Sequence, residues 1–224
     1  VLLHRGTGDA LLKKAVRVVA KGSGMPQFFN DEAIIAELEK LGISHQDAMD
    51  YAIVGCVELT TQGNNLGWSD AAMFNLNKVL ELTLHHGRCL LTNQQLGPDL
   101  GGLDTYESYE ELESAFDAMI DHFLQRMIPA CEEVEKAHID ILPSPFLSSV
   151  IDDCMEQGMD VTRGGAHYNL SGIQMIQVAN LADSLAAIKA LVYDRKSVTG
   201  EALQYALEHN FSHDEMLRPR LLNK

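Results

Sequence analysis

A thiol and a carboxylate stand two residues apart at the end of a short apolar run, in the sequence YAIVGCVE. The run Tyr51–Val54 predicts a buried strand that ends at Gly55 and is followed by Cys56 and Glu58. Residues two apart in an extended backbone project to the same face. We therefore expect the sulfur and the carboxylate to look into one enclosed volume, where they could move hydrogen atoms and protons.

The same residues also have an ordinary structural interpretation. Cysteine is commonly a small buried apolar residue, and Glu58 could be a solvated loop carboxylate. A second acid, Asp70, follows at the predicted start of a helix. The pattern alone leaves both interpretations open.

Composition restricts the classes of protein. The chain has 224 residues, of which 46 % are hydrophobic, enough for a sizeable core in one large domain or two small ones. The net charge of −15 argues against a nucleic-acid partner, which requires basic clusters. No run is apolar enough to span a membrane, and the first residues lack the pattern of a signal peptide, so we expect a cytoplasmic protein.

The other potential metal or redox residues have unremarkable spacing. Cys89, Cys131 and Cys154 form no C-x-x-C pair with Cys56 or with one another, so they predict neither a zinc site nor a disulfide framework. His209 and His213 have the H-x-x-x-H spacing, but no glutamate follows the first. We therefore predict no metal site.

Periodicity and capping residues predict a chain in which helices outnumber short strands, an α/β class of fold. A polar connector is expected over residues 60–67, and Ser69 or Asp70 is expected to cap the helix that follows it. Glycine-rich residues 162–170 predict a loop or strand. The helices are expected at residues 9–22, 31–40, from 44, about 70–86, 108–138, 146–155, 173–191 and 200–209.

Several segments resemble the glycyl radical enzymes, the family of pyruvate formate-lyase and glycerol dehydratase. The residues around Cys56 resemble the cysteine finger loop of that family, and similar segments follow in family order along the whole chain. They are MPQFFND (25–31), DYAIVGCVE (50–58), GWSDAAMFNLNKVLELTL (67–84), GGAHYNLSG (164–172), NLADSLAAIKALV (180–192) and LRPRLLNK (217–224).

The resemblance implies a ten-stranded α/β barrel of the glycyl radical enzyme type, helix-rich, with the cysteine loop inside. Residues 1–224 would be a partial catalytic domain carrying the finger loop at about residues 51–66. The radical motif R-V-x-G-[YF] does not occur in the sequence. We therefore expect a middle-to-late fragment whose radical glycine lies outside this chain, and which is inactive by itself.

The resemblance also implies a chemistry. A glycyl radical, installed by a radical S-adenosylmethionine activating enzyme, would draw a hydrogen atom from Cys56, and the thiyl would then attack a substrate carbon. Glu58 would act as general base, and Asp70 would bind a substrate hydroxyl. No bound cofactor is implied beyond the protein radical. The implied partners are a small-molecule substrate, the activating enzyme and a second copy in a homodimer.

Departures from the family pattern favour the glycerol dehydratase branch. Pyruvate formate-lyase has two adjacent cysteines, whereas Gly55 and Val57 flank Cys56 here, and the choline-cleaving branch has a tyrosine where Met73 stands. Many dehydratases have proline at the position of Leu59, which leaves the substrate open. We expect a dehydratase of glycerol or propane-1,2-diol. The alternatives are a formate C-acetyltransferase, an arylacetate decarboxylase, a C–N or C–S lyase, or an inactive fragment.

Overall fold

A computed structural model describes residues 1–223, which divide into two compact units. The first unit contains residues 1–69 and 138–172, and the second contains residues 70–137 and 173–224. The division falls within two strands that pair with each other, β5 (Asn65–Asn75) and β6 (Tyr168–Ile176). Each unit is described here by itself.

The first unit begins with a small α/β segment. Strand β1 (Leu2–Leu3) pairs in parallel with β2 (Phe29–Asn30), and helix α1 (Asp9–Val18) with the π-helical turn η1 (Val19–Ser23) connects them. Asn30 caps α2 (Asp31–Lys40) by accepting from the Glu32 N–H, and Ser44 caps α3 (His45–Met49) by accepting from the Asp47 N–H. Both helices begin where the sequence predicts, because a cap is specified by neighbouring residues.

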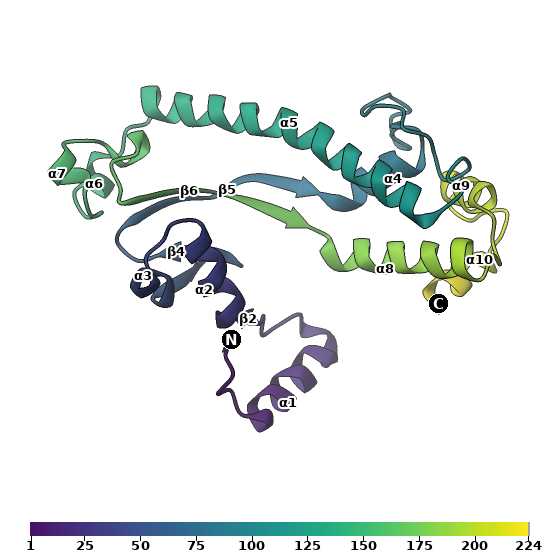
Figure 1. The fold of residues 1–224 in the computed structure, drawn as a ribbon, viewed down its shortest axis with the longest axis horizontal. Helices are drawn as coiled ribbons and strands as arrows, with labels where there is room; N and C mark the ends of the chain where they lie inside the picture. Colours follow the sequence, from purple (N-terminus) through teal and green to yellow (C-terminus); the bar gives the residue numbers. More distant parts are fainter. Residues whose placement is uncertain (224) are drawn as a thin grey trace. The chain divides into compact units, whose positions relative to one another are not determined.

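An antiparallel hairpin follows α3 (Figure 1). Its strands are β3 (Tyr51–Val54) and β4 (Glu58–Thr61), with Tyr51 opposite Thr61 and Val54 opposite Glu58. The inner side chains pack with α2, α3 and β6 in a small core. Its buried members are Leu38, Ile43, Ala48 and Tyr51, with Ile34, Ile35, Ile53, Leu59, Tyr168 and Leu170 partly buried around them.

The rest of the first unit is a group of short elements, α6 (Pro145–Ser148), α7 (Cys154–Gln157) and the 3₁₀ turn η2 (Val161–Arg163). Cys154, Val161 and Ala166 form its own small core. The Asp160 carboxylate joins these elements by accepting from the Ser144 N–H, the Ser148 hydroxyl and the Thr162 N–H at 2.9–3.0 Å. Although burial opposes it, these bonds and that of the Thr162 hydroxyl lower the pKa of Asp160 to about 2.

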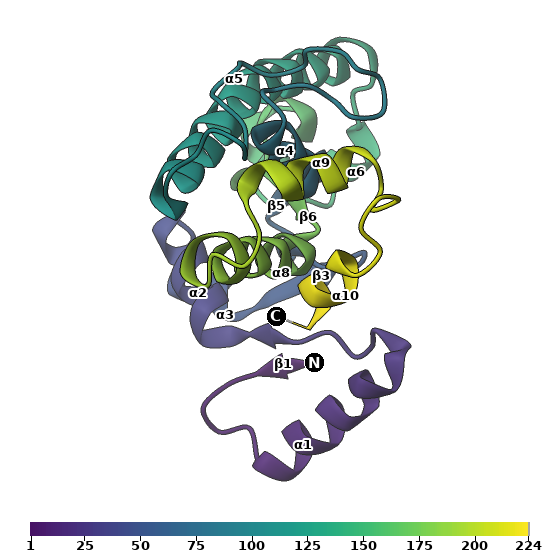
Figure 2. The same cartoon turned by 90° about the vertical axis from the view of Figure 1, so that its right-hand side faces the viewer.

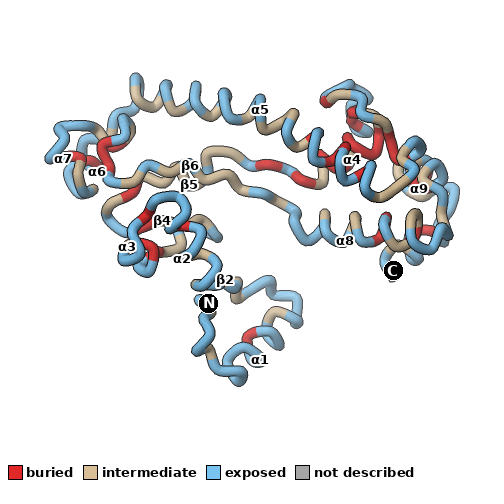
Figure 3. Tube along the Cα trace, viewed as in Figure 1, coloured by how far each residue is buried: buried red, intermediate tan, exposed pale blue. Residues whose placement is uncertain are grey.

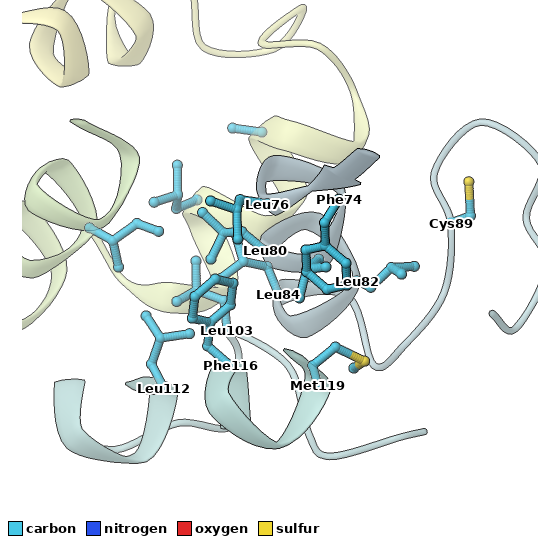
Figure 4. Packing of buried hydrophobic residues seen from close by; sticks show 14 of the residues in the cluster. Phe74, Leu76, Leu80, Leu82, Leu84, Cys89, Leu103, Leu112, Phe116 and Met119 are labelled. Atoms are coloured by element: carbon cyan, nitrogen blue, oxygen red, sulfur yellow. The ribbon is translucent and has the colours of Figure 1, made fainter. Parts of the chain in front are cut away.

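The second unit is helical and holds the largest core. Its helices are α4 (Leu76–Leu84), most of α5 (Tyr109–Ile141), α8 (Val178–Ile188), α9 (Gly200–Glu208) and α10 (Leu217–Leu222), with the π-helical turn η3 (Lys189–Asp194) after α8. Figure 2 shows α8, α9 and α10 near α4. In the core, Leu80, Leu84 and Leu103 meet Leu112, Phe116 and Met119 of α5 (Figure 4).

Burial along α5 is uneven (Figure 3). Its buried residues, Leu112, Ala115, Phe116 and Met119, all lie in the first third of the helix. Farther along, Ile128 is 53 % exposed and Ile141 is 73 % exposed. The helix has about the extent that its amphipathic pattern predicts, and its second half has apolar side chains that are more than half exposed.

Two of the predicted helices begin later in the structure than the sequence predicts. The segment from Asp70 to Asn75 belongs to β5, and α4 begins after Asn75, whose side chain accepts from the Lys78 N–H at 2.9 Å. Likewise, Ile173–Ile176 belongs to β6, and α8 begins at Val178. The helix predicted over 146–155 is two short helices instead. Pairing between β5 and β6 joins residues about a hundred positions apart, and such pairing overrides local helical periodicity.

Candidate active site

Cys56 lies at the tip of the β3–β4 hairpin, in the three-residue turn Gly55–Val57. The strand prediction for Tyr51–Val54 is confirmed, but the extended geometry does not continue through the cysteine. Cys56 and Glu58 therefore do not share a face as alternate residues of one strand. Glu58 is instead the first residue of β4, paired with Val54.

The turn nevertheless brings the Glu58 carboxylate to the backbone of the cysteine. Its Oε2 atom accepts hydrogen bonds from the backbone N–H groups of Cys56 and Val57, both at 2.9 Å. Gly55 permits this arrangement because its φ is +57° and because a Cβ there would lie 2.9 Å from Oε2. The carboxylate is thus fixed over the tip by two N–H donors, which complement its negative charge.

The thiol at the tip is exposed to solvent in the described part of the chain. Cys56 is exposed, Val57 is 40 % exposed, and Glu58 is half-buried. The described residues therefore supply an exposed thiol and a fixed carboxylate, but they do not form the enclosed volume that the sequence pattern predicts around them.

Asp70 occupies an exposed position in β5. The prediction that it caps a helix is wrong, since Asn75 has that role. Asp70 belongs to the second unit, whereas Cys56 and Glu58 belong to the first.

A polar cluster at the base of the same hairpin had no signal in the sequence. The Tyr168 hydroxyl donates to Asp47 Oδ2 at 2.7 Å and accepts from the Ser44 N–H at 3.0 Å. The side-chain N–H of Asn64 donates to Asp47 Oδ1 at 3.1 Å, and the backbone carbonyl of Asn64 accepts from the Tyr168 N–H at 2.9 Å. Tyr168 is 121 positions from Asp47, so local sequence patterns could not relate the two.

The remaining cysteines have structural surroundings. Cys154 is 2 % exposed, and burial raises the pKa of its thiol. Cys131 Sγ lies 3.8 Å from the Ala71 carbonyl. Cys89 differs from them, because hydrogen bonds at Thr92 lower the pKa of its buried thiol, and Lys78 Nζ lies 3.6 Å away.

Two adjacent histidines lie at the end of α4 and bond to neighbouring groups of the chain. His85 is 4 % exposed at the end of α4, with Nδ1 2.8 Å from the Glu81 carbonyl. His86 lies between the carboxylates of Asp99 and Asp104, at 3.0 Å from each.

The adjacent glycines 164 and 165 form a tight turn, since a Cβ on Gly165 would lie 2.2 Å from the Met159 carbonyl oxygen. Among residues 1–223, no group of three metal-ligating side chains is placed to hold an ion.

The chain belongs to the pyruvate formate lyase-like family, whose model matches residues 1–224. One curated relative is the (2S)-3-sulfopropanediol dehydratase of Klebsiella oxytoca, 39 % identical over 97 % of this chain and 26 % of the relative. The chain thus spans about a quarter of the length of such relatives. The curated proteins that this chain is similar to include dehydratases and a sulfite-lyase.

Solved structures agree with the family. The glycerol-bound B12-independent glycerol dehydratase from Clostridium butyricum has a TM-score of 0.83 and 37 % identity, covering 98 % of this chain and 28 % of that one. A glycyl radical enzyme from Archaeoglobus fulgidus has a TM-score of 0.82 and 30 % identity, over 99 % of this chain and 28 % of that one. The mixed helix and strand structure therefore resembles a portion of these enzymes. No helix among the described residues is long and apolar enough to cross a lipid bilayer.

Proposed function

We propose that this chain is part of a glycyl radical dehydratase that removes water from a small diol. The observation that carries the proposal is the β3–β4 hairpin, with Cys56 presented at its tip and the Glu58 carboxylate fixed over the tip backbone. The hairpin occurs in a chain that is 39 % identical to one dehydratase and superposes on another with a TM-score of 0.83.

In this proposal the chain supplies the residues that move hydrogen. A glycyl radical in a segment outside this chain would supply the unpaired electron. Cys56 gives up its S–H hydrogen atom, and the resulting thiyl takes a hydrogen atom from a hydroxyl-bearing substrate carbon. Glu58 then accepts the proton of that hydroxyl, which promotes loss of the neighbouring hydroxyl.

The steps balance as a dehydration. The departing hydroxide takes the proton that Glu58 received, so one water leaves and an aldehyde-type carbon radical remains. That radical takes a hydrogen atom from Cys56, which restores the thiyl and releases the aldehyde. Asp70 would orient the substrate by accepting a hydrogen bond from one of its hydroxyls.

We further propose that residues 1–224 form part of one catalytic domain of the ten-stranded barrel type, with residues 51–66 as its inward finger loop. The relatives are about four times longer than this chain, and the additional residues would enclose the exposed tip. The longer protein would be a cytoplasmic homodimer activated by a radical S-adenosylmethionine enzyme.

Glycerol and propane-1,2-diol are the first candidate substrates, because the chain superposes on a glycerol-bound dehydratase. A diol that carries a sulfonate is a second candidate, since the Klebsiella relative named for such a substrate is 39 % identical. A positively charged side chain in contact with the sulfonate would favour the second candidate over the first.

The test uses the longest protein that contains this sequence, activated without oxygen. We expect a glycyl doublet in its electron paramagnetic resonance spectrum and release of an aldehyde from one of the three diols. A protein that gives the doublet but dehydrates none of them, and instead cleaves a C–N, C–S or carboxylate-bearing substrate, would overturn the dehydratase assignment. Absence of the doublet would overturn the radical mechanism.

A further inference from the structure

We propose that Tyr168 and Asp47 are positioning residues for Cys56, acting through the base of the hairpin that carries it. The inference rests on the proposed function for its catalytic consequence. Its structural part concerns only the first unit, which contains all the residues involved.

The contacts of Tyr168 and Asp47 hold both ends of the hairpin. Ser44 caps α3, which leads directly into β3, and its N–H and hydroxyl bond to the Tyr168 and Asp47 side chains at 3.0 and 2.7 Å. Asn64 lies just after β4. Its side chain donates a hydrogen bond to Asp47, and its backbone carbonyl accepts one from the Tyr168 backbone N–H. The entry and the exit of the hairpin are therefore fixed to one point on β6.

The hairpin depends on such an anchor because it has no neighbouring strand. Strands β3 and β4 form a two-stranded sheet by themselves within the described residues. An isolated hairpin of two strands is marginally stable in water. Tyr168 packs against the same small buried core as Ile53 and Leu59 of the two strands, and that core includes Tyr51 of β3.

The charge of Asp47 strengthens the anchor. Hydrogen bonds from Ser44 and Tyr168 lower the pKa of Asp47, which is therefore a carboxylate at neutral pH. Hydrogen bonds to a charged acceptor are stronger than those between neutral groups. His167 packs edge-on against the Tyr168 ring, with 4.5 Å between ring centroids, and its Nδ1 lies 2.6 Å from Asp153. The Tyr168 ring is thus held by His167 as well as by the hydrogen bonds of its hydroxyl.

Positioning matters for hydrogen-atom transfer because the reacting atoms must meet at close range. A displacement of about 1 Å at a reacting group can cost about a hundredfold in rate. Loosening the base of the hairpin lets the tip sample more positions while leaving its residues intact. The expected consequence is slower hydrogen transfer with little change in substrate affinity.

The first experiment measures amide hydrogen exchange of residues 51–61 in the Tyr168→Phe variant, which keeps the ring and removes only the hydroxyl. Tyr106→Phe is the matched control: it is also half-buried, and its hydroxyl donates to the Thr83 carbonyl at 3.1 Å in the second unit. We expect exchange about tenfold faster in the hairpin for Tyr168→Phe only. Equal exchange in the two variants would overturn the anchor.

The second experiment uses the activated longer protein. We expect Tyr168→Phe and Asp47→Asn to lower kcat about tenfold, with KM and the glycyl signal unchanged, while Tyr106→Phe behaves as wild type. Faster exchange with an unchanged kcat would show that the cluster is merely structural and would reject the positioning role. A wild-type protein without a glycyl signal would instead reject the proposed function and leave the exchange result standing.

Discussion

Gly55, Cys56 and Glu58 act together as one local arrangement at the hairpin tip. The positive φ of Gly55 turns the chain, and the missing Cβ leaves space for the carboxylate that accepts from the next two N–H groups. The sequence pattern predicted that an extended strand would place Cys56 and Glu58 on one face. The structure instead places Cys56 in a turn, and the Glu58 side chain bonds to the backbone of that turn.

Gly55→Ala should therefore destabilise the chain by more than an ordinary glycine substitution. The comparison is Gly63→Ala, where φ is +77° and a Cβ would meet no atom within 4 Å. A non-glycine residue in this region costs about 1–3 kcal/mol, and Gly63→Ala should show only that cost. Gly55→Ala should exceed it because the Glu58 carboxylate must move. Urea unfolding measures both, and equal losses would contradict the steric argument.

Cys56→Ser should abolish product formation by the activated longer protein while its glycyl signal persists, because an O–H bond is too strong to replace the S–H bond in the relay. Glu58→Gln should lower the rate by about 10²–10⁴ if the carboxylate is the general base. Cys131→Ser is the control, since that thiol lies outside the hairpin. Turnover by Cys56→Ser near the wild-type rate would eliminate the role proposed for the thiol.

At the scale of elements, the sequence predictions were right or wrong according to how far along the chain the stabilising contacts of each element lie. Helices α2, α3 and α9 begin where the sequence predicts, because the cap of each bonds to an N–H two or three residues away. The strand over 65–75 was predicted as a connector and the start of a helix, and the strand over 168–176 was predicted only in part, because each is stabilised by its distant partner strand. The hairpin base was not predicted for the same reason, since Tyr168 reaches Asp47 across 121 positions.

The corrected start of α4 can be tested by a pair of substitutions. Asn75→Ala removes the side chain that accepts from the Lys78 N–H and should cost about 1 kcal/mol of stability. Asp70→Ala alters an exposed strand position and should change stability by less than about 0.5 kcal/mol. Thermal or urea unfolding distinguishes them, and a larger loss for Asp70→Ala would restore the predicted cap.

The hydrogen bonds of the Asp160 carboxylate should make the stability of the first unit depend on pH under acidic conditions. Because the folded pKa of Asp160 is about 2, below the ordinary value of 3.8, its contribution is present above about pH 4 and is lost as pH falls toward 2. Asp160→Asn should weaken the unit at neutral pH and flatten this part of the stability curve. Unfolding followed from pH 5 to pH 2 tests this, with Asp152→Asn as control. An unaltered slope in Asp160→Asn would contradict the assignment.

At the scale of the whole molecule, the family follows from segments along the entire chain, whereas the substrate does not follow from any of them. Residues such as Val57 and Met73 indicate which branches are disfavoured, but a substrate pocket is assembled from many segments. This chain spans 26 % of one dehydratase relative and 28 % of another. We therefore propose that most of the side chains that select a substrate lie outside this chain.

The uneven burial of α5 has a consequence for handling the isolated chain. Ile128, Val134 and Ile141 are each more than half exposed, and Phe146 beyond the helix is 84 % exposed. Bare apolar surface of this kind promotes self-association, while the net charge of −15 makes the molecules repel one another. Added salt screens that repulsion. Light scattering from the 224-residue chain should therefore rise with sodium chloride concentration, and replacement of Phe146 and Ile141 by serine should suppress the rise.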